Sequence, residues 1–151
     1  MILKTLAGIS AAAGIIIAPA TGCDFEQHGT GLHITPHFSV PRHPSEQVAK
    51  VLGEVVIYVR TPPQEGHVHM ILQHRDPVTH VWITDGSDSA AGPWYAHTTR
   101  NLQARGACSR VHRTMKWRMR ITWRGIATDG TRYGEQSRYW PNRYGKRITC
   151  G

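Results

Sequence analysis

The sequence lacks the short motifs that mark common enzymes and metal proteins. It has no Gly-x-Ser-x-Gly elbow, no His-Glu-x-x-His pair and no Gly-rich phosphate loop. Its three cysteines are too far apart for a Cys-x-x-Cys zinc knuckle. We therefore expect no catalytic residues, no cofactor and no small-molecule substrate, and we interpret Asp85, Asp88 and Asp129 as turn residues.

Charged residues are also few, and acidic ones are the fewest. Only 19% of the 151 residues are charged while 40% are hydrophobic, which excludes a wholly disordered chain and is enough for one packed core. Ten Asp and Glu stand against eighteen Lys and Arg, for a formal net charge of +8. This surplus favours anionic partners, and it also fits a surface whose charge serves only solubility.

The longest apolar run lies at the N-terminus. Residues 1–20 carry a single basic residue, Lys4, near their start, followed by an apolar run from Thr5 to Ile17, and end in Ala18-Pro19-Ala20. A basic start, an apolar middle and a small-x-small end are typical of a secretory signal peptide, here cleaved after Ala20. An uncleaved anchor is the alternative, although a bilayer needs about twenty apolar residues. We expect a secreted, extracellular protein.

The odd cysteine count gives a second interpretation of the N-terminal region. Cys108 and Cys150 flank the most strand-like part of the chain, so we predict a disulfide between them. Cys23 is then left over. The segment Ala20–Cys23 resembles a bacterial lipoprotein processing site, although Ala20 replaces the usual large aliphatic residue. Lipidation of Cys23, which would attach the protein to the cell envelope, is the alternative to plain secretion.

Residues 21–47 are predicted to form a linker rich in Gly, Pro and His. Pro36, Pro41 and Pro44 interrupt any regular element there. The apolar side chains between Leu32 and Val40 leave open one short strand, or a segment that docks on the core.

Residues 48–151 are predicted to form one all-β domain. Short runs with a period of two are separated by turn residues, and no segment has a convincing helical period. In the clearest run, Met115–Arg124, Trp117 and Trp123 lie on the apolar face and are expected to be buried. The expected strands are Leu52–Arg60, His67–His74, Val78–Thr84, Trp94–Thr99, Met115–Arg124, Arg132–Trp140 and Tyr144–Cys150. About seven strands in roughly a hundred residues predict an immunoglobulin-like antiparallel β-sandwich.

Several short motifs lie along these strands. They are Pro62-Pro63 followed by His67, then Cys108, Trp117-Arg118, Asp129-Gly130 and Ile148-Thr149-Cys150. In these motifs the chain from Val55 to Cys150 resembles small secreted β-sandwich proteins common in actinobacteria. The resemblance implies a Pro-Pro turn, a core tryptophan and a bracketing disulfide. Those proteins often carry a cysteine in the first strand, where this chain has Ile57, Tyr58 and Val59, so no second core disulfide is implied. No established activity comes with that family.

A row of cations alternates with the apolar residues of Met115–Arg124. Lys116, Arg118, Arg120 and Arg124 would extend about 26 Å along one strand face, since alternate residues lie about 6.6 Å apart. An anionic envelope polymer, a membrane surface or a nucleic acid could follow this row. Nearby basic and aromatic residues are Arg110, Arg113, Trp140, Arg143, Tyr144, Lys146 and Arg147. The alternative is a solvated face whose charges discourage edge-to-edge association.

Two histidines are the only metal candidates that the pattern offers. His67 and His69 project from the same face of one strand, but zinc or copper needs a third or fourth ligand that the sequence does not place. Surface histidines are the commoner explanation of such a pair, so no metal site is predicted. The sequence as a whole predicts a secreted or envelope-associated, non-enzymatic β-sandwich, with a polyanion-binding module as the alternative function.

Overall fold

The computed structural model describes residues 25–26, 31–40, 50–108 and 112–150. The predicted signal peptide, Cys23, Arg110 and parts of the predicted linker lie outside these residues. All regular structure in the described part is β-strand, and no helix in it could span a membrane. The strands are β1 (Phe25–Glu26), β2 (Leu32–Ser39), β3 (Lys50–Val59), β4 (Glu65–Arg75), β5 (Trp82–Ala91), β6 (Thr98–Ala107), β7 (Thr114–Ile126), β8 (Arg132–Trp140) and β9 (Lys146–Thr149).

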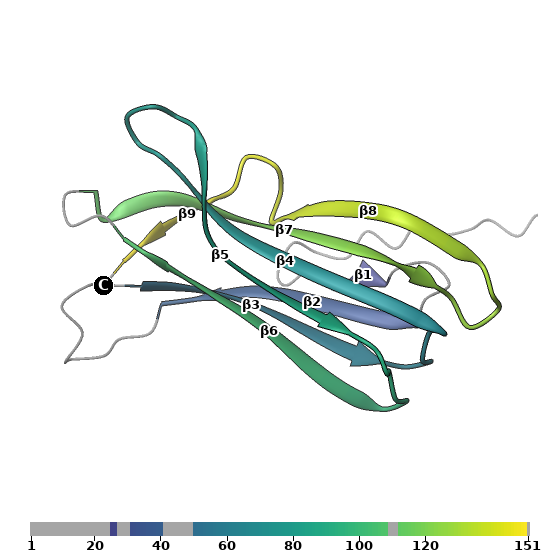
Figure 1. Cartoon of the computed structure of the whole chain (residues 1–151). Helices are drawn as coiled ribbons and strands as arrows, with labels where there is room; N and C mark the ends of the chain where they lie inside the picture. Colours follow the sequence, from purple (N-terminus) through teal and green to yellow (C-terminus); the bar gives the residue numbers. More distant parts are fainter. Residues whose placement is uncertain (1–24, 27–30, 41–49, 109–111, 151) are drawn as a thin grey trace, which may run out of the picture.

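The strands form two antiparallel sheets that pack face to face (Figure 1). Sheet A has the order β1-β2-β3-β6. Sheet B has the order β5-β4-β7-β8, and β9 also pairs with β7. In immunoglobulin-like sandwiches the first, second and fifth strands share one sheet, and the third, sixth and seventh share the other. If β2 is counted as the first strand, β5 is the fourth and pairs with the third strand, β4, at the edge of sheet B. The other strands are then divided between the two sheets in the same way, which confirms the predicted fold class.

The core lies between the sheets and follows the predicted alternation. On β7 the apolar face from Met115 to Trp123 is buried, and the Trp117 and Trp123 side chains have no exposed surface. Sheet A supplies the opposite wall from alternate residues of β2 and β3, which are Leu32, Ile34, Val51, Val55, Ile57 and Val59. The alternation in the sequence therefore correctly predicts which side chains face the interior of the sandwich.

Strand β2 lies inside the segment predicted to be a linker. It pairs with β3 from Leu32 to Ser39, so the short strand that the sequence leaves open in this segment does form. Pro36 is tolerated because β1 pairs only with His33 and Ile34. At Pro36, β2 has one hydrogen-bonded neighbour among the described strands, and a residue without an N–H is accepted at such an edge.

The predicted strands Val78–Thr84 and Trp94–Thr99 are both misplaced, because the intervening acids do not make a loop. Strand β5 continues through Asp85 and Asp88 to Ala91, and β6 begins only at Thr98. The Asp85 carboxylate accepts a hydrogen bond from His74 Nδ1 at 2.6 Å, and the Asp88 carboxylate accepts one from the Gln103 N–H at 2.9 Å. These acids bind groups on neighbouring strands, so the interpretation of them as turn residues is wrong. Asp129, in contrast, does lie in the β7–β8 turn.

The predicted disulfide between Cys108 and Cys150 is present. It joins the residue after β6 to the residue after β9, and both cysteines are buried. The Cys150 N–H also donates to the Arg113 carbonyl at 2.9 Å. The C-terminal segment is thereby fixed to the sandwich. Disulfides persist in oxidising compartments, so the bond is compatible with an extracellular location.

Candidate functional site

The outer face of sheet B is built by the register of β4 and β7. These strands pair without a register shift, so their outward residues stand in opposite pairs. The pairs are His67 and Arg124, His69 and Thr122, Ile71 and Arg120, Gln73 and Arg118, and Arg75 and Lys116. The four cations of the predicted row, Lys116, Arg118, Arg120 and Arg124, all alternate with the buried apolar face of β7 and so lie on this outer face.

Arg118 is held firmly by the protein itself. Its guanidinium carbon lies 3.9 Å from the Trp82 ring centre and 4.3 Å from the Tyr139 ring centre. Its Nε donates to Gln73 Oε1 at 2.9 Å, and one terminal nitrogen donates to the Arg143 carbonyl at 2.7 Å. Burial lowers the pKa of this guanidinium from its usual value. Arg118 therefore serves chiefly to join β4, β5, β7 and β8 across the face.

The next cation of the row is also engaged. Arg120 donates from Nε and a terminal nitrogen to Ser137 Oγ, at 3.3 and 3.2 Å. Ser137 Oγ lies 3.0 Å from the hydroxyl of Thr122, which is buried. Arg124 is exposed and has no hydrogen-bond or ion-pair partner in the described part of the chain. The four cations thus lie on one face as predicted. The side chains of the two middle ones, Arg118 and Arg120, are bonded to residues of other strands.

Three cations meet at one end of the row. Lys116 stands opposite Arg75 of β4 on one side and opposite Arg147 of β9 on the other. Neighbouring strands are about 4.8 Å apart, so three cations lie side by side across three strands. We call Arg75, Lys116 and Arg147 the basic triad. The triad lines a depression of about 370 Å³ together with Asp76, Pro77, His80, Thr114 and Met115.

No member of the basic triad forms an ion pair with a carboxylate of the described residues, although one charged carboxylate lies in the same depression. The Asp76 carboxylate lines the same depression, but it accepts the N–H groups of Val78 and Thr79 at 2.9 and 2.6 Å. Like charges directly opposite each other destabilise a sheet. A bound anion would remove that cost.

Sequence reasoning finds only part of this cluster. Lys116 is predicted as a member of the row, and Arg147 belongs to the nearby basic residues. Arg75 is missed because the predicted strand ends at His74, whereas β4 extends through Arg75. The signal is present in the alternation that starts at His67, since Arg75 continues the same face. Trp82 is missed as the stacking partner of Arg118, because their contact depends on the pairing of β4 with both β5 and β7.

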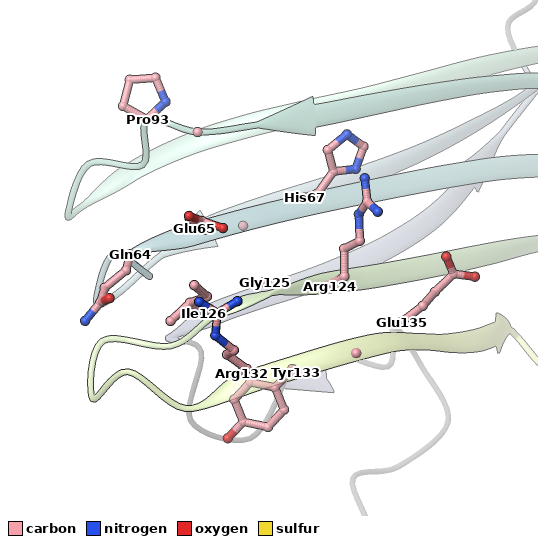
Figure 2. Close-up of a pocket in the computed structure, with 13 residues that line it drawn as sticks. Gln64, Glu65, His67, Pro93, Arg124, Gly125, Ile126, Arg132, Tyr133 and Glu135 are labelled. Carbon is pink, nitrogen blue, oxygen red and sulfur yellow. The ribbon is translucent and has the colours of Figure 1, made fainter.

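The two histidine candidates lie on the outer face but do not assemble a metal site. His67 and His69 are both partly exposed, and His67 stands opposite Arg124. Figure 2 shows the Arg124 guanidinium beside the His67 ring. Across the described ranges, no group of three or more His, Cys, Asp or Glu side chains could hold a metal ion.

A larger depression of about 780 Å³ lies at the opposite end of β4 and β7. Its charged side chains include Glu65, Arg124, Arg132 and Glu135. Figure 2 shows the carboxylates of Glu65 and Glu135 well apart along the surface. None of these four side chains bonds to another within the described residues.

Comparisons with known proteins give no match. No family model matches the chain, and no curated protein sequence matches it. The charge and geometry of the outer face of sheet B are therefore the basis for the function proposed next.

Proposed function

We propose that this protein is a non-catalytic, exported or envelope-associated β-sandwich that binds an anionic partner through the outer face of sheet B. The observation that carries the proposal is the basic triad, in which three cations stand in register without an ion-paired acid in the described part of the chain. Closely spaced phosphate or carboxylate groups are the chemistry that such a cluster attracts.

The export part of the proposal has separate support. The N-terminal residues have the pattern of a signal peptide, and the segment that ends at Cys23 resembles a lipidation site in which Ala20 replaces the usual large aliphatic residue. The disulfide between Cys108 and Cys150 is compatible with an oxidising compartment. The resemblance to small secreted β-sandwich proteins of actinobacteria points the same way. Secretion and lipid attachment remain the two alternatives within this proposal.

Binding of the mature protein to long-chain inorganic polyphosphate tests the role of the triad. Affinity should fall steeply as salt rises, because each cation that meets a phosphate releases counterions. The double variant Lys116→Gln/Arg147→Gln should bind more weakly, and the slope of log affinity against log salt should shrink by roughly 1.4 to 1.8, at about 0.7 to 0.9 per cation.

The matched control is Arg60→Gln/Arg105→Gln, which removes the same charge from sheet A and the loop that follows β3. Both arginines are exposed and neither side chain has a bonding partner among the described residues. The control should bind polyphosphate nearly as the native protein does. Equal losses in the two double variants would show that only net charge matters, and the proposed binding face would be wrong.

A further inference from the structure

The turn between β4 and β5, together with the start of β5, exposes an unusual amount of apolar surface. The side chains of Val78, Val81 and Ile83 are 77%, 59% and 42% exposed. We call these three residues the apolar tip. Figure 1 shows the β4–β5 hairpin projecting beyond the body of the sandwich. Apolar side chains this exposed add little to the stability of the fold, and a group of them is typical of a contact surface.

The apolar tip is held in a defined turn. The Asp76 carboxylate accepts the N–H groups of Val78 and Thr79, and the Asp76 N–H donates to the Val81 carbonyl at 2.9 Å. The bonds to Thr79 and Val78 lower the pKa of Asp76, so its carboxylate stays charged and bound to the turn. The tip is therefore presented in one shape and does not need to be ordered by its partner.

An exposed aromatic side chain lies on the neighbouring connection. Tyr144, between β8 and β9, is 61% exposed. This connection lies against the hairpin, since a Cβ at Gly145 would come within 2.6 Å of Trp82 Cη2. Figure 1 shows both connections projecting from the same side of sheet B. Tyrosine is favoured where one part of a side chain meets apolar surface and another meets water.

The basic triad lies at the base of the same hairpin. Arg75 is the last residue of β4, immediately before the turn, and Lys116 and Arg147 stand beside it. Pro77 and His80 of the turn line the depression that the triad borders. Apolar side chains at the tip and cations at its base are the combination by which proteins dock on the surface of an anionic bilayer.

We propose that this end of the molecule docks on an anionic lipid bilayer, with the apolar tip and Tyr144 entering the headgroup region and the basic triad contacting lipid phosphates. The inference rests on the proposed function and names its partner. A purely polar polymer would satisfy the triad and leave the tip in water. A second copy of the chain is disfavoured because two triads would face each other in a protein that carries a net charge of +8.

Sedimentation with lipid vesicles tests the proposal. The native mature protein should sediment with vesicles of phosphatidylcholine and phosphatidylglycerol and not with vesicles of phosphatidylcholine alone. Val78→Ser/Val81→Ser should weaken binding to the anionic vesicles about tenfold. Lys116→Gln/Arg147→Gln should weaken it roughly thirtyfold, at about fivefold per cation. The tip variant should keep its affinity for polyphosphate, because that ligand contacts only the triad.

Two matched controls accompany these variants. Tyr95→Ser removes a side chain about as exposed as that of Val81, from the β5–β6 connection at the far end of β5. Arg60→Gln/Arg105→Gln removes two charges that lie far from the triad. Both should bind anionic vesicles as the native protein does.

The outcomes separate this inference from the proposed function. Binding of the native protein to polyphosphate without binding to anionic vesicles would overturn the bilayer as partner and leave the anion-binding face intact. Vesicle binding that the tip variant retains in full would overturn insertion of the tip. Failure to bind either ligand would overturn both proposals.

Discussion

The two sheets approach each other very closely at Gly106, and this contact allows a sharp test of the core. A Cβ at this position of β6 would lie 2.4 Å from Cζ3 and 2.5 Å from Cη2 of Trp117. It would also lie 3.1 Å from Asp85 Cβ. Because the Trp117 indole is completely buried in a close-packed interior, it has no free volume into which it can move.

Gly106→Ala should therefore destabilise the protein. An additional methyl in a filled core typically costs about 1 to 3 kcal/mol. Replacing glycine by alanine in a strand gains about 0.5 to 1 kcal/mol of backbone entropy, which offsets only part of that cost. Urea unfolding with the disulfide intact should show a lower midpoint with an unchanged slope, since the variant alters stability and not the surface exposed on unfolding.

Gly134→Ala is the matched control for this measurement. Gly134 lies in β8 and is exposed, and a Cβ added there would meet no atom within 4 Å. The same chemical change should be neutral there or stabilising by a few tenths of a kcal/mol to about 1 kcal/mol. If both alanine variants shifted the midpoint equally, the proposed contact between β6 and the indole would be wrong.

A second variant assigns the cost to the indole itself. Trp117→Phe removes the ring atoms that the new methyl would strike. In this background Gly106→Ala should cost less than in the native protein, with a coupling of about 1 kcal/mol or more between the two sites. Additive effects of the two substitutions would refute the explanation even if Gly106→Ala alone were destabilising.

Two further predictions concern a partly buried carboxyl and the buried disulfide. Burial raises the pKa of the Asp85 carboxyl and outweighs the opposing effect of His74. The folded state therefore holds this proton more tightly than the unfolded state does. The stability that the carboxyl contributes is fully present below pH 3.8, its usual pKa, and is lost as pH rises through the raised pKa. Asp85→Asn keeps an oxygen for the bond from His74 Nδ1 and should gain stability relative to the native protein as pH rises across that window, as measured by thermal unfolding at closely spaced pH. A difference that stays constant with pH would contradict this. Cys108→Ser opens the loop closed by Cys150, with a sequence separation of 42, and should cost about 4 kcal/mol in urea unfolding; a loss below about 1 kcal/mol would show that the bond contributes little.

The fold class could be predicted because burial leaves a local signature. In β7 each apolar residue from Met115 to Trp123 is followed by a polar one, and the pairing of Cys108 with Cys150 follows from their positions around that region. The signature fails where strands are neither apolar nor continuous. Strand β5 contains Asp85 and Asp88, whose carboxylates bind groups on β4 and β6, and a single sequence does not reveal such partners.

The candidate site was predictable only along one strand. The cations of β7 follow from its period of two, but the basic triad depends on the register of β4 and β9 against β7. Register between distant segments is set by the whole sheet and by its turns. The commitment of Arg118 to Trp82 and Tyr139 has the same origin, since three strands must be in place before the stack exists.

The strand order also has a consequence for when the protein folds. The central pairings join β3 to β6 and β4 to β7, so each closes a long stretch of chain. Such pairings form slowly, because the entropy of loop closure is lost before any contact repays it. The hairpin of β4 and β5 can form early, but the pairing of β4 with β7 at the centre of sheet B must wait until β7 is available. If the chain is exported as proposed, this late pairing would favour an unfolded state during passage through a narrow export channel.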